Sequence, residues 1–483
     1  MTNLISSNRQ YLIILFYLII SAMGISQFYG SISSLICFDF VLLILALTAT
    51  AEKAFFIDIL MSFYLTMGFF LKLNISIFMG GRYYETLFMG PISSTTALDK
   101  ALQVSSTAFC ALLIAHSLFH YFFYKKSSNN RLALDNIYIF YQKYKKLFFS
   151  VLIFLVFFAN YSNYYFEIYT KGGINTYNFF IANLYKYFIS IGLTFLILYL
   201  LLIDLYKGNK FPWEFIGLIF YENTLSSISQ YSRAMIITSS SIMLGIYKHC
   251  KINKLGLNFK FLSITVALLL ILFSFSLYVV SQSRNEKFIK IEAIQQSQVT
   301  QISDNSSPGD LNFMEIMNNA IKPMLIDRWV GIEGVIAVSS NEKLSWNLFL
   351  LSLEERNVRG LSFYDSIFIN SPYKNSNFEK KQFVTLPGFI AFFFYPGSFL
   401  FLFFSILLLS LIIFFIEWYA LALTNYNYII ASFLSNLIVY RFVNFGYMPL
   451  NTIQYIVLIL ITLLFYFYTI NFLNARLCKL NCK

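Results

Sequence analysis

Hydrophobic segments follow one another along almost the whole chain, and a single long polar stretch, residues 281–384, interrupts them. A helix needs about 20 consecutive apolar residues to cross the hydrocarbon core of a bilayer, and segments of that kind recur here. With 58% hydrophobic and 12% charged residues, the chain is too apolar for a water-soluble globular protein. The sequence therefore predicts an all-α polytopic membrane protein.

The apolar segments predict about twelve transmembrane helices. Their ranges are 10–28, 31–49, 54–72, 101–124, 147–164, 183–206, 213–230, 233–247, 261–280, 397–418, 427–442 and 453–473. This pattern divides the chain into an N-terminal bundle of about nine helices (1–280), one large loop (281–384) and a C-terminal part (385–483). We expect a GT-C-like arrangement of these parts.

Basic residues are concentrated in four stretches, which all fall on one side of a twelve-helix bundle together with both termini. The stretches are 125–146, 207–210, 248–260 and 476–483, and they hold fifteen Lys and Arg against one acid, Asp135. Because Lys and Arg are enriched in cytoplasmic loops, this side is predicted to be the cytoplasm. The net charge of +12 thus reflects orientation in a membrane, and we expect no nucleic-acid partner.

The loop 281–384 is predicted to lie on the opposite side, with 73–100 and 165–182. It carries eleven Lys and Arg and twelve Asp and Glu, so it is nearly neutral. That balance is typical of a soluble domain rather than of a linker. We expect a small subdomain outside the cytoplasm.

Three arginines near the outer ends of predicted helices are the first candidate ligands: Arg233, Arg284 and Arg441. A charge at membrane depth costs about 2.5–3.5 kcal/mol even on the lenient insertion scale, so it normally has a partner. A guanidinium group binds phosphate oxygens through two parallel N–H groups, and the three together would suit a diphosphate. The alternative is snorkelling to the interface or, for Arg233, an ion pair with Glu222.

Within the loop, a helix is predicted after Pro323. An apolar stripe with the spacing i, i+4, i+7 and i+11 comprises Leu325, Trp329, Ile332 and Ile336. Arg328 and Glu333 flank this stripe. The residues that face away from it are Asp327, Gly331 and Gly334. The pattern predicts a helix lying on the membrane surface, with Trp329 at headgroup level. The alternative is a helix packed inside the loop's own core.

Two Pro-Gly pairs, at 387–388 and 396–397, interrupt the apolar run that follows the loop. They argue against one continuous span, because proline breaks a helix and glycine marks a turn. A short re-entrant or interfacial element ahead of the tenth helix is predicted instead. Irregular backbone at that depth normally lines a cavity.

Other polar residues in the apolar segments favour structural roles. His116 and His120 are four residues apart, with no acidic third ligand apparent in the sequence, so they are interpreted as interfacial packing and no metal site is expected. Asp39 and Asp58 lie near predicted helix ends, where an ion path is the alternative. No cofactor is expected.

Several short motifs occur in a defined order along the chain. They are Tyr169-x-Lys171-Gly172, Ser232-Arg233, Arg328-Trp329 with Glu333 in the large loop, and the Pro-Gly pairs of Pro387 to Gly397. In this order, and with this topology over nearly the whole chain, the sequence resembles the Wzy-type O-antigen polymerases, which polymerise oligosaccharide repeat units.

The resemblance implies a multi-pass glycosyltransferase in the inner membrane of a Gram-negative bacterium, with both termini cytoplasmic. Such an enzyme acts in lipopolysaccharide or other polysaccharide biosynthesis. It transfers a growing glycan from undecaprenyl diphosphate onto another lipid-linked repeat unit at the periplasmic face. The implied partners are the lipid-linked oligosaccharide, membrane lipid and a chain-length regulator protein.

For that reaction, Glu333 is the predicted general base, with Asp327 behind it. The predicted substrate ligands are Arg233, Arg328, Arg284, Arg441, Trp329, Lys171 and Arg82. Arginines placed around the departing diphosphate would stabilise its developing charge, so the reaction needs no metal ion.

Two other functions stay open. An O-antigen ligase shares this architecture but usually has a histidine in its loop, and none of the three histidines is predicted to lie outside. A flippase or transporter for lipid-linked oligosaccharides would carry charges at the bilayer midplane and paired repeats, which the sequence lacks.

Overall fold

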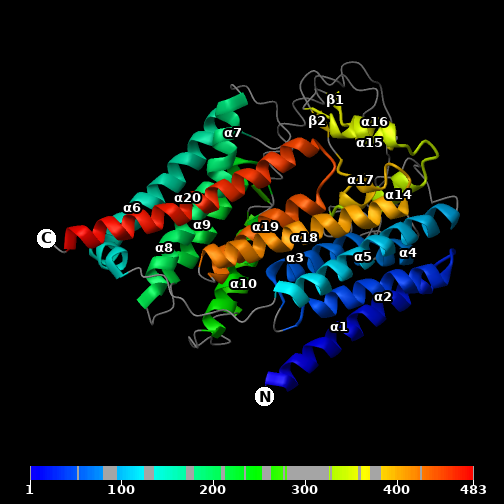
Figure 1. Ribbon diagram of the computed structural model, residues 1–483, viewed down its shortest axis with the longest axis horizontal. Helices are drawn as coiled ribbons and strands as arrows, with labels where there is room; N and C mark the ends of the chain where they lie inside the picture. Colours follow the sequence, from blue (N-terminus) through cyan, green and yellow to red (C-terminus); the bar gives the residue numbers. More distant parts are fainter. Residues whose placement is uncertain are drawn as a thin grey trace, which may run out of the picture. The chain divides into compact units, whose positions relative to one another are not determined.

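The computed structural model describes most of the hydrophobic segments and part of the large loop. The described residues are 2–51, 54–79, 95–123, 135–169, 179–207, 213–232, 235–252, 263–275, 278–279, 326, 329–356, 360–369, 382–383, 385–424 and 427–481. They are nearly all helical (Figure 1).

The first half of the chain contains ten labelled α-helices and two π-helical turns. They are α1 (Thr2–Ile25), α2 (Ile32–Thr48), α3 (Phe56–Leu65), η1 (Thr66–Leu71), α4 (Lys72–Phe78), α5 (Thr95–Phe123), α6 (Asp135–Phe166), α7 (Phe179–Tyr187), η2 (Phe188–Gly192), α8 (Leu193–Lys207), α9 (Trp213–Ser229) and α10 (Met235–Ile252). A further apolar helix spans Ser263–Phe275.

The second half alternates short and long elements. They are α14 (Ile332–Ser339), α15 (Trp346–Leu353), β1 (Gly360–Leu361), α16 (Phe363–Ile367), β2 (Gln382–Phe383), α17 (Phe389–Phe393), α18 (Phe399–Leu423), α19 (Tyr428–Val443) and α20 (Pro449–Asn481). The two short strands pair in parallel, Gly360 with Gln382 and Leu361 with Phe383.

Six helical segments within the described residues are long and apolar enough to cross a membrane. They are Phe56–Phe78, Thr95–Phe123, Asp135–Phe166, Ile181–Tyr206, Phe399–Leu423 and Pro449–Thr469. Shorter apolar helices are Gln10–Ile25, Ile32–Thr48, Ser263–Phe275 and Tyr428–Val443. This architecture is consistent with the predicted all-α membrane protein, and each predicted apolar segment overlaps a helix of the described residues.

The chain forms two compact units. One comprises Met1–Lys126, Pro308–Tyr419 and Ser435–Leu460, and the other comprises Ser127–Ser307, Ala420–Leu434 and Ile461–Lys483. The first unit contains α1 to α5 and the described part of the loop. The second contains α6 to α10. The boundaries of these two units differ from those of the three parts predicted from hydropathy, because the chain after residue 384 contributes segments to both units.

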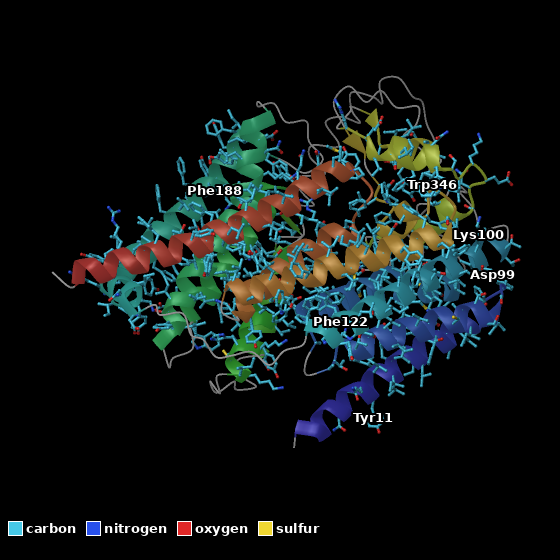
Figure 2. The ribbon with its side chains drawn as sticks, in the orientation of Figure 1. Tyr11, Asp99, Lys100, Phe122, Phe188 and Trp346 are labelled. Carbon is cyan, nitrogen blue, oxygen red and sulfur yellow. The ribbon has the colours of Figure 1, made fainter. Side chains whose placement is uncertain are left out.

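In the first unit, α2 packs against α1 and α5, while α14 and α17 both pack against α5 (Figure 1). The buried core is apolar and rich in phenylalanine, such as Phe38 and Phe109, whose ring centroids lie 5.6 Å apart. Large apolar side chains also cover the outside of this unit. Tyr11 on α1 and Phe122 on α5 are both 69% exposed (Figure 2). An apolar exterior of this kind suits contact with lipid.

The predicted break before the tenth helix is confirmed. Helix α17 is a five-residue, fully buried helix that ends at Phe393, and α18 begins only at Phe399. Gly388 and Gly397 flank α17 with φ values of +82° and +75°, conformations that favour glycine. Each glycine therefore supplies a turn next to a proline.

Candidate functional site

The sequence-predicted residues Glu333 and Trp329 meet α4 at a buried ion pair in the first unit. Lys72 Nζ lies 2.9 Å from Glu333 Oε2 and donates a hydrogen bond of 2.9 Å to the carbonyl oxygen of Trp329. Both charged residues have no exposed surface. Because a buried charge is costly unless it is paired, this contact fixes the start of α14 against α4.

The backbone approach beside this ion pair requires glycine on both sides. A Cβ atom on Gly331 would lie 1.8 Å from the carbonyl oxygen of Gly68, and one on Gly68 would lie 2.2 Å from the carbonyl oxygen of Val330. Gly68 belongs to the π-helical turn η1, which separates α3 from α4. Lys72 is the first residue of α4, so this turn brings the lysine and the loop backbone together.

An aromatic cluster covers the same region. The ring of Trp329 packs edge-on against Phe63 and Tyr64 of α3, with centroid distances of 5.5 and 5.8 Å. Tyr64 in turn contacts Tyr440 of α19 at 6.2 Å. The next residue along α19 is Arg441, whose guanidinium carbon lies 4.3 Å from the ring centroid of Tyr455. This cation–π contact gives Arg441 a structural partner in α20.

The predicted surface position of the loop helix is wrong. Helix α14 begins at Ile332, so Trp329 precedes it, and every residue of α14 is buried. Gly334 faces the protein too, since a Cβ there would lie 2.1 Å from the carbonyl oxygen of Pro387. The small side chains, interpreted from the sequence as facing away, instead allow close backbone packing. Glu333 consequently lies in the protein interior and not on an exposed face of a surface helix.

The described part of the loop lines an open cavity of about 390 Å³ in the first unit. Its lining comprises Leu351, Glu354, Glu355, Arg356, Leu361, Ser362, Phe363, Ser366 and Tyr447. Volumes of about 300–1,000 Å³ are typical of ligand sites. Two carboxylates and a guanidinium group on three consecutive residues make the cavity suited to a polar, hydroxyl-rich or anionic ligand.

Glu355 joins two segments of the cavity wall. One carboxylate oxygen accepts a 2.7 Å hydrogen bond from the Phe363 N–H, and the other accepts one of 3.1 Å from the Met448 N–H. Burial raises the pKa of Glu355, and the nearby Asp365 charge adds to this effect. A carboxyl group with a raised pKa is a stronger base once ionised. The sequence interpretation missed this group, although the Glu-Glu-Arg run in the loop was visible.

In the second unit, Asn163 of α6 forms hydrogen bonds with Tyr169 and Ser229. Its amide nitrogen donates hydrogen bonds to the carbonyl oxygens of Tyr169, at 3.0 Å, and Ser229, at 2.9 Å. Its side-chain oxygen accepts one from the Tyr169 N–H at 2.9 Å. Tyr169 begins the Tyr-x-Lys-Gly motif, and Ser229 lies three residues before Ser232. Asn163 thus connects Tyr169 to the end of α9, while Lys171, Gly172 and Arg233 of the two motifs lie outside the described residues.

Glu222, the predicted alternative partner of Arg233, is buried in α9. Its carboxylate accepts hydrogen bonds from Thr194 at 3.1 Å and from Ser226 at 2.9 Å. Most predicted site residues lie outside the described residues: Arg82, Lys171, Arg233, Arg284, Asp327 and Arg328. The predicted convergence of Arg233 and Arg284 with Arg441 therefore stays a prediction.

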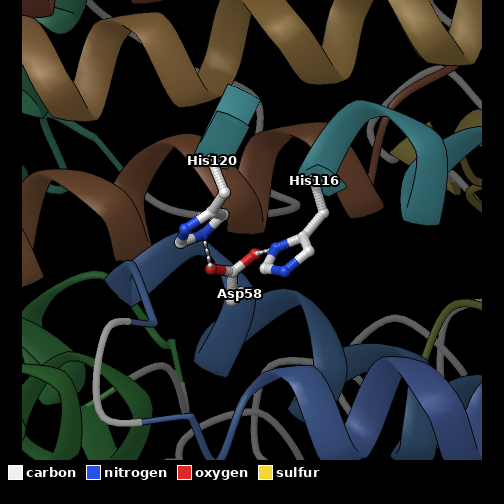
Figure 3. A group of neighbouring side chains, drawn as sticks. All are labelled: Asp58, His116 and His120. Carbon is white, nitrogen blue, oxygen red and sulfur yellow. Dashed lines mark hydrogen bonds and ion pairs between the residues drawn. The ribbon is translucent and has the colours of Figure 1, made fainter. Parts of the chain in front are cut away.

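Another cluster of polar side chains in the first unit consists of Asp58, His116 and His120 (Figure 3). His116 Nδ1 is 2.7 Å from one oxygen of Asp58, and His120 Nε2 is 3.3 Å from the other. The expectation that the two histidines have no acidic partner is wrong. The carboxylate belongs to a different helix, which spacing along the chain does not reveal.

Comparison of the chain with protein-family models, with curated proteins and with solved structures found no match.

Proposed function

We propose that this chain is a glycan polymerase of the Wzy type. It would span the inner membrane about twelve times in a GT-C-like arrangement, with both termini in the cytoplasm and the large loop in the periplasm. The enzyme transfers a growing glycan from undecaprenyl diphosphate onto a second lipid-linked repeat unit. The ordered motifs and the one-sided distribution of cytoplasmic cations support this proposal.

The observation that carries the proposal is the cavity of about 390 Å³ lined by Glu354, Glu355 and Arg356. It belongs to the segment predicted to lie outside the cytoplasm, where the lipid-linked glycans are displayed. Carboxylates accept hydrogen bonds from sugar hydroxyl groups, and a guanidinium group binds phosphate or sugar oxygens. The cavity thus combines size, polarity and position for the end of a glycan chain.

In the proposed reaction, a hydroxyl oxygen at the non-reducing end of the acceptor attacks C1 of the donor sugar. The bond between C1 and the diphosphate oxygen breaks, and the electron pair stays with the diphosphate. Glu355 accepts the hydroxyl proton, a role that its raised pKa favours. Arginines stabilise the charge of the departing diphosphate; Arg233, Arg284, Arg328 and Arg441 are proposed for this role.

The role of Glu333 is reassigned in this proposal. A general base needs a proton donor within hydrogen-bond reach, and the carboxylate of Glu333 is buried against Lys72. We assign Glu333 to positioning, because its ion pair fixes the segment of Trp329. The residues that remain candidates for contact with the glycan are Asp327, Trp329, Lys171 and Arg82.

The test is complementation of a deletion strain, read as the banding pattern of its lipopolysaccharide or surface glycan on a gel. The wild-type chain should restore a long ladder. Glu355→Gln and Arg233→Ala should leave lipid A core with at most one repeat unit, while the protein remains inserted at normal levels. Arg233→Lys should be poor too, because lysine lacks the two-pronged donor geometry.

Glu342→Gln is the matched control, since Glu342 is exposed in the same part of the loop and does not line the cavity. It should restore the full ladder. A normal ladder with Glu355→Gln would remove the base role from this residue. A deletion strain lacking even the single repeat unit would overturn the polymerase proposal in favour of a ligase or a flippase.

A further inference from the structure

Two helices of the first unit bring three metal-ligating side chains together. His116 and His120 are four residues apart on α5, so both project from one face of the helix, and Asp58 of α3 lies between them (Figure 3). The potential ligand atoms all lie within 4.8 Å of one another. The two imidazole rings are 4.2 Å apart between centroids.

The acidic member of this group is held in place by the start of α3. Asp58 Oδ2 accepts a 2.9 Å hydrogen bond from the Phe55 N–H. The next two N–H groups, of Phe56 and Ile57, each donate a 2.8 Å bond to the carboxylate of Glu417. Three of the N–H groups that a helix leaves unpaired at its start are thus satisfied by carboxylates. This arrangement fixes both the backbone and the carboxylate orientation of Asp58.

A small cavity adjoins the group. It has a volume of about 20 Å³, and Asp58, His116, Thr48, Ser62 and Ser410 are among the residues that line it. A cavity of about 10–15 Å³ already holds one water molecule. The space beside the three ligands therefore suits one water-sized ligand next to an ion.

We propose that Asp58, His116 and His120 bind a divalent transition-metal ion of the zinc class. Two imidazole nitrogens and one carboxylate oxygen are donors that zinc prefers, and three protein ligands leave a fourth position for solvent. Zinc–ligand distances of about 2.0–2.2 Å put neighbouring donors roughly 3.3 Å apart. The observed contacts of 2.7 and 3.3 Å reach that spacing with a side-chain shift of under about 1 Å.

Burial removes most of the solvent that would compete for these donor atoms. The group is largely buried: the side chain of Asp58 is 3% exposed, and those of His116 and His120 are 15% and 19% exposed. A divalent ion with two neutral histidines uses the lone pairs of both rings and the carboxylate charge simultaneously.

The ion would join α3 to α5 at one end of the unit. Lys72 lies fourteen positions after Asp58 along the same helical segment, so at 1.5 Å per residue the two groups are roughly 20 Å apart. The metal is therefore not proposed to contact the glycan, and this inference does not rest on the proposed function. Its expected effect is to stabilise the packing of the two helices.

The experiment uses the full chain, purified in detergent with a tag that contains no histidine and then stripped with a chelator. Zinc binding is measured by titration with a competing chromophoric chelator, and cobalt(II) absorption reports the ligand geometry. We expect one zinc ion per chain and a rise in the thermal unfolding temperature on binding. Asp58→Asn, His116→Ala and His120→Ala should each lower the affinity at least tenfold.

His249→Ala is the matched control, because His249 is the third histidine and lies on α10 in the second unit. It should bind zinc as the wild type does. Size-exclusion chromatography identifies variants that no longer fold, and His116→Gln, which retains a hydrogen-bonding side chain, replaces an unfolded alanine variant. The proposal is overturned if the folded wild type binds no zinc at micromolar concentration, or if ligand variants and wild type bind equally.

Discussion

The pairing of Lys72 with Glu333 explains why two charges tolerate complete burial. Each charge would be strongly disfavoured alone, and their separation of 2.9 Å compensates for part of the lost hydration. Lys72 also donates to the carbonyl oxygen of Trp329, so one ammonium group satisfies two acceptors. At the scale of single residues, this contact links the start of α14 to α4.

Removing one member of this pair should destabilise the protein strongly. Lys72→Met leaves the Glu333 carboxylate without its counter-ion, at a cost of about 3–5 kcal/mol for a buried pair. Replacing both, as Lys72→Met with Glu333→Leu, should recover most of the loss because no buried charge remains. The free energy of unfolding in mixed micelles measures this, with the double variant completing a mutant cycle.

Glu214→Gln provides the control for the cycle. Glu214 forms an ion pair of 3.3 Å with Lys145, but its side chain is 65% exposed. Solvent screens such a pair, so its loss should change stability by less than about 1 kcal/mol. If Glu214→Gln and Lys72→Met lowered the free energy of unfolding equally, burial would not determine the contribution of the Lys72–Glu333 pair to stability.

The sequence pattern predicts some of these residues as site residues, but it does not reveal their contacts. Glu333 and Trp329 were identified because they stand in a patterned segment of a polar loop. Lys72 was not, since one lysine near the end of an apolar segment is ordinary in a membrane protein. Asp58 and His116 are 58 residues apart in sequence, and only the folded arrangement of α3 and α5 brings them together.

At the scale of elements, the amphipathic pattern identified α14 but gave it the wrong surroundings. Hydropathy distinguishes an apolar stripe from a polar face, and it treats glycine as neutral. In this helix the glycine positions are packing surfaces, as in membrane helices whose small residues allow close backbone approach. The Pro-Gly pairs were interpreted correctly because their effect on the backbone is local and depends on no neighbour.

The approach of Gly331 to Gly68 leads to a prediction at this scale. Gly331→Ala should displace the loop segment from η1, because the added methyl group would overlap the Gly68 carbonyl oxygen. We expect lower thermal stability and faster cleavage of the loop by a protease. Limited proteolysis of the protein in nanodiscs, followed by mass spectrometry, measures the cleavage.

Gly217→Ala is the control for that substitution. Gly217 lies in α9, and a Cβ atom there would have no neighbour within 4 Å. Alanine favours the helix interior over glycine by about 0.5–1 kcal/mol, so this variant should be neutral or slightly more stable. If Gly331→Ala behaved like Gly217→Ala, the close approach of α14 to η1 would not be required for the fold.

At the scale of the whole molecule, the distribution of charge determines orientation more than any single residue does. Four stretches hold fifteen cations and one acid, whereas residues 281–384 are nearly neutral. Lys and Arg resist transfer across the membrane, so each stretch favours the cytoplasm. All four stretches and both termini share one side only if an even number of spans separates each stretch from the next and from the N-terminus.

That condition can be tested with reporter fusions. Alkaline phosphatase folds to an active enzyme only outside the cytoplasm, and green fluorescent protein fluoresces when it folds inside. We expect active phosphatase for fusions within 281–307 and inactive phosphatase for fusions within 127–134 and after Lys483. Green fluorescent protein should give the opposite pattern. Phosphatase activity at the C-terminus together with activity in the loop would require an even number of crossings between the two points. The cationic tail of 476–483 would then lie outside, which would contradict the predicted twelve-helix topology and remove one of the four cytoplasmic stretches on which the orientation depends.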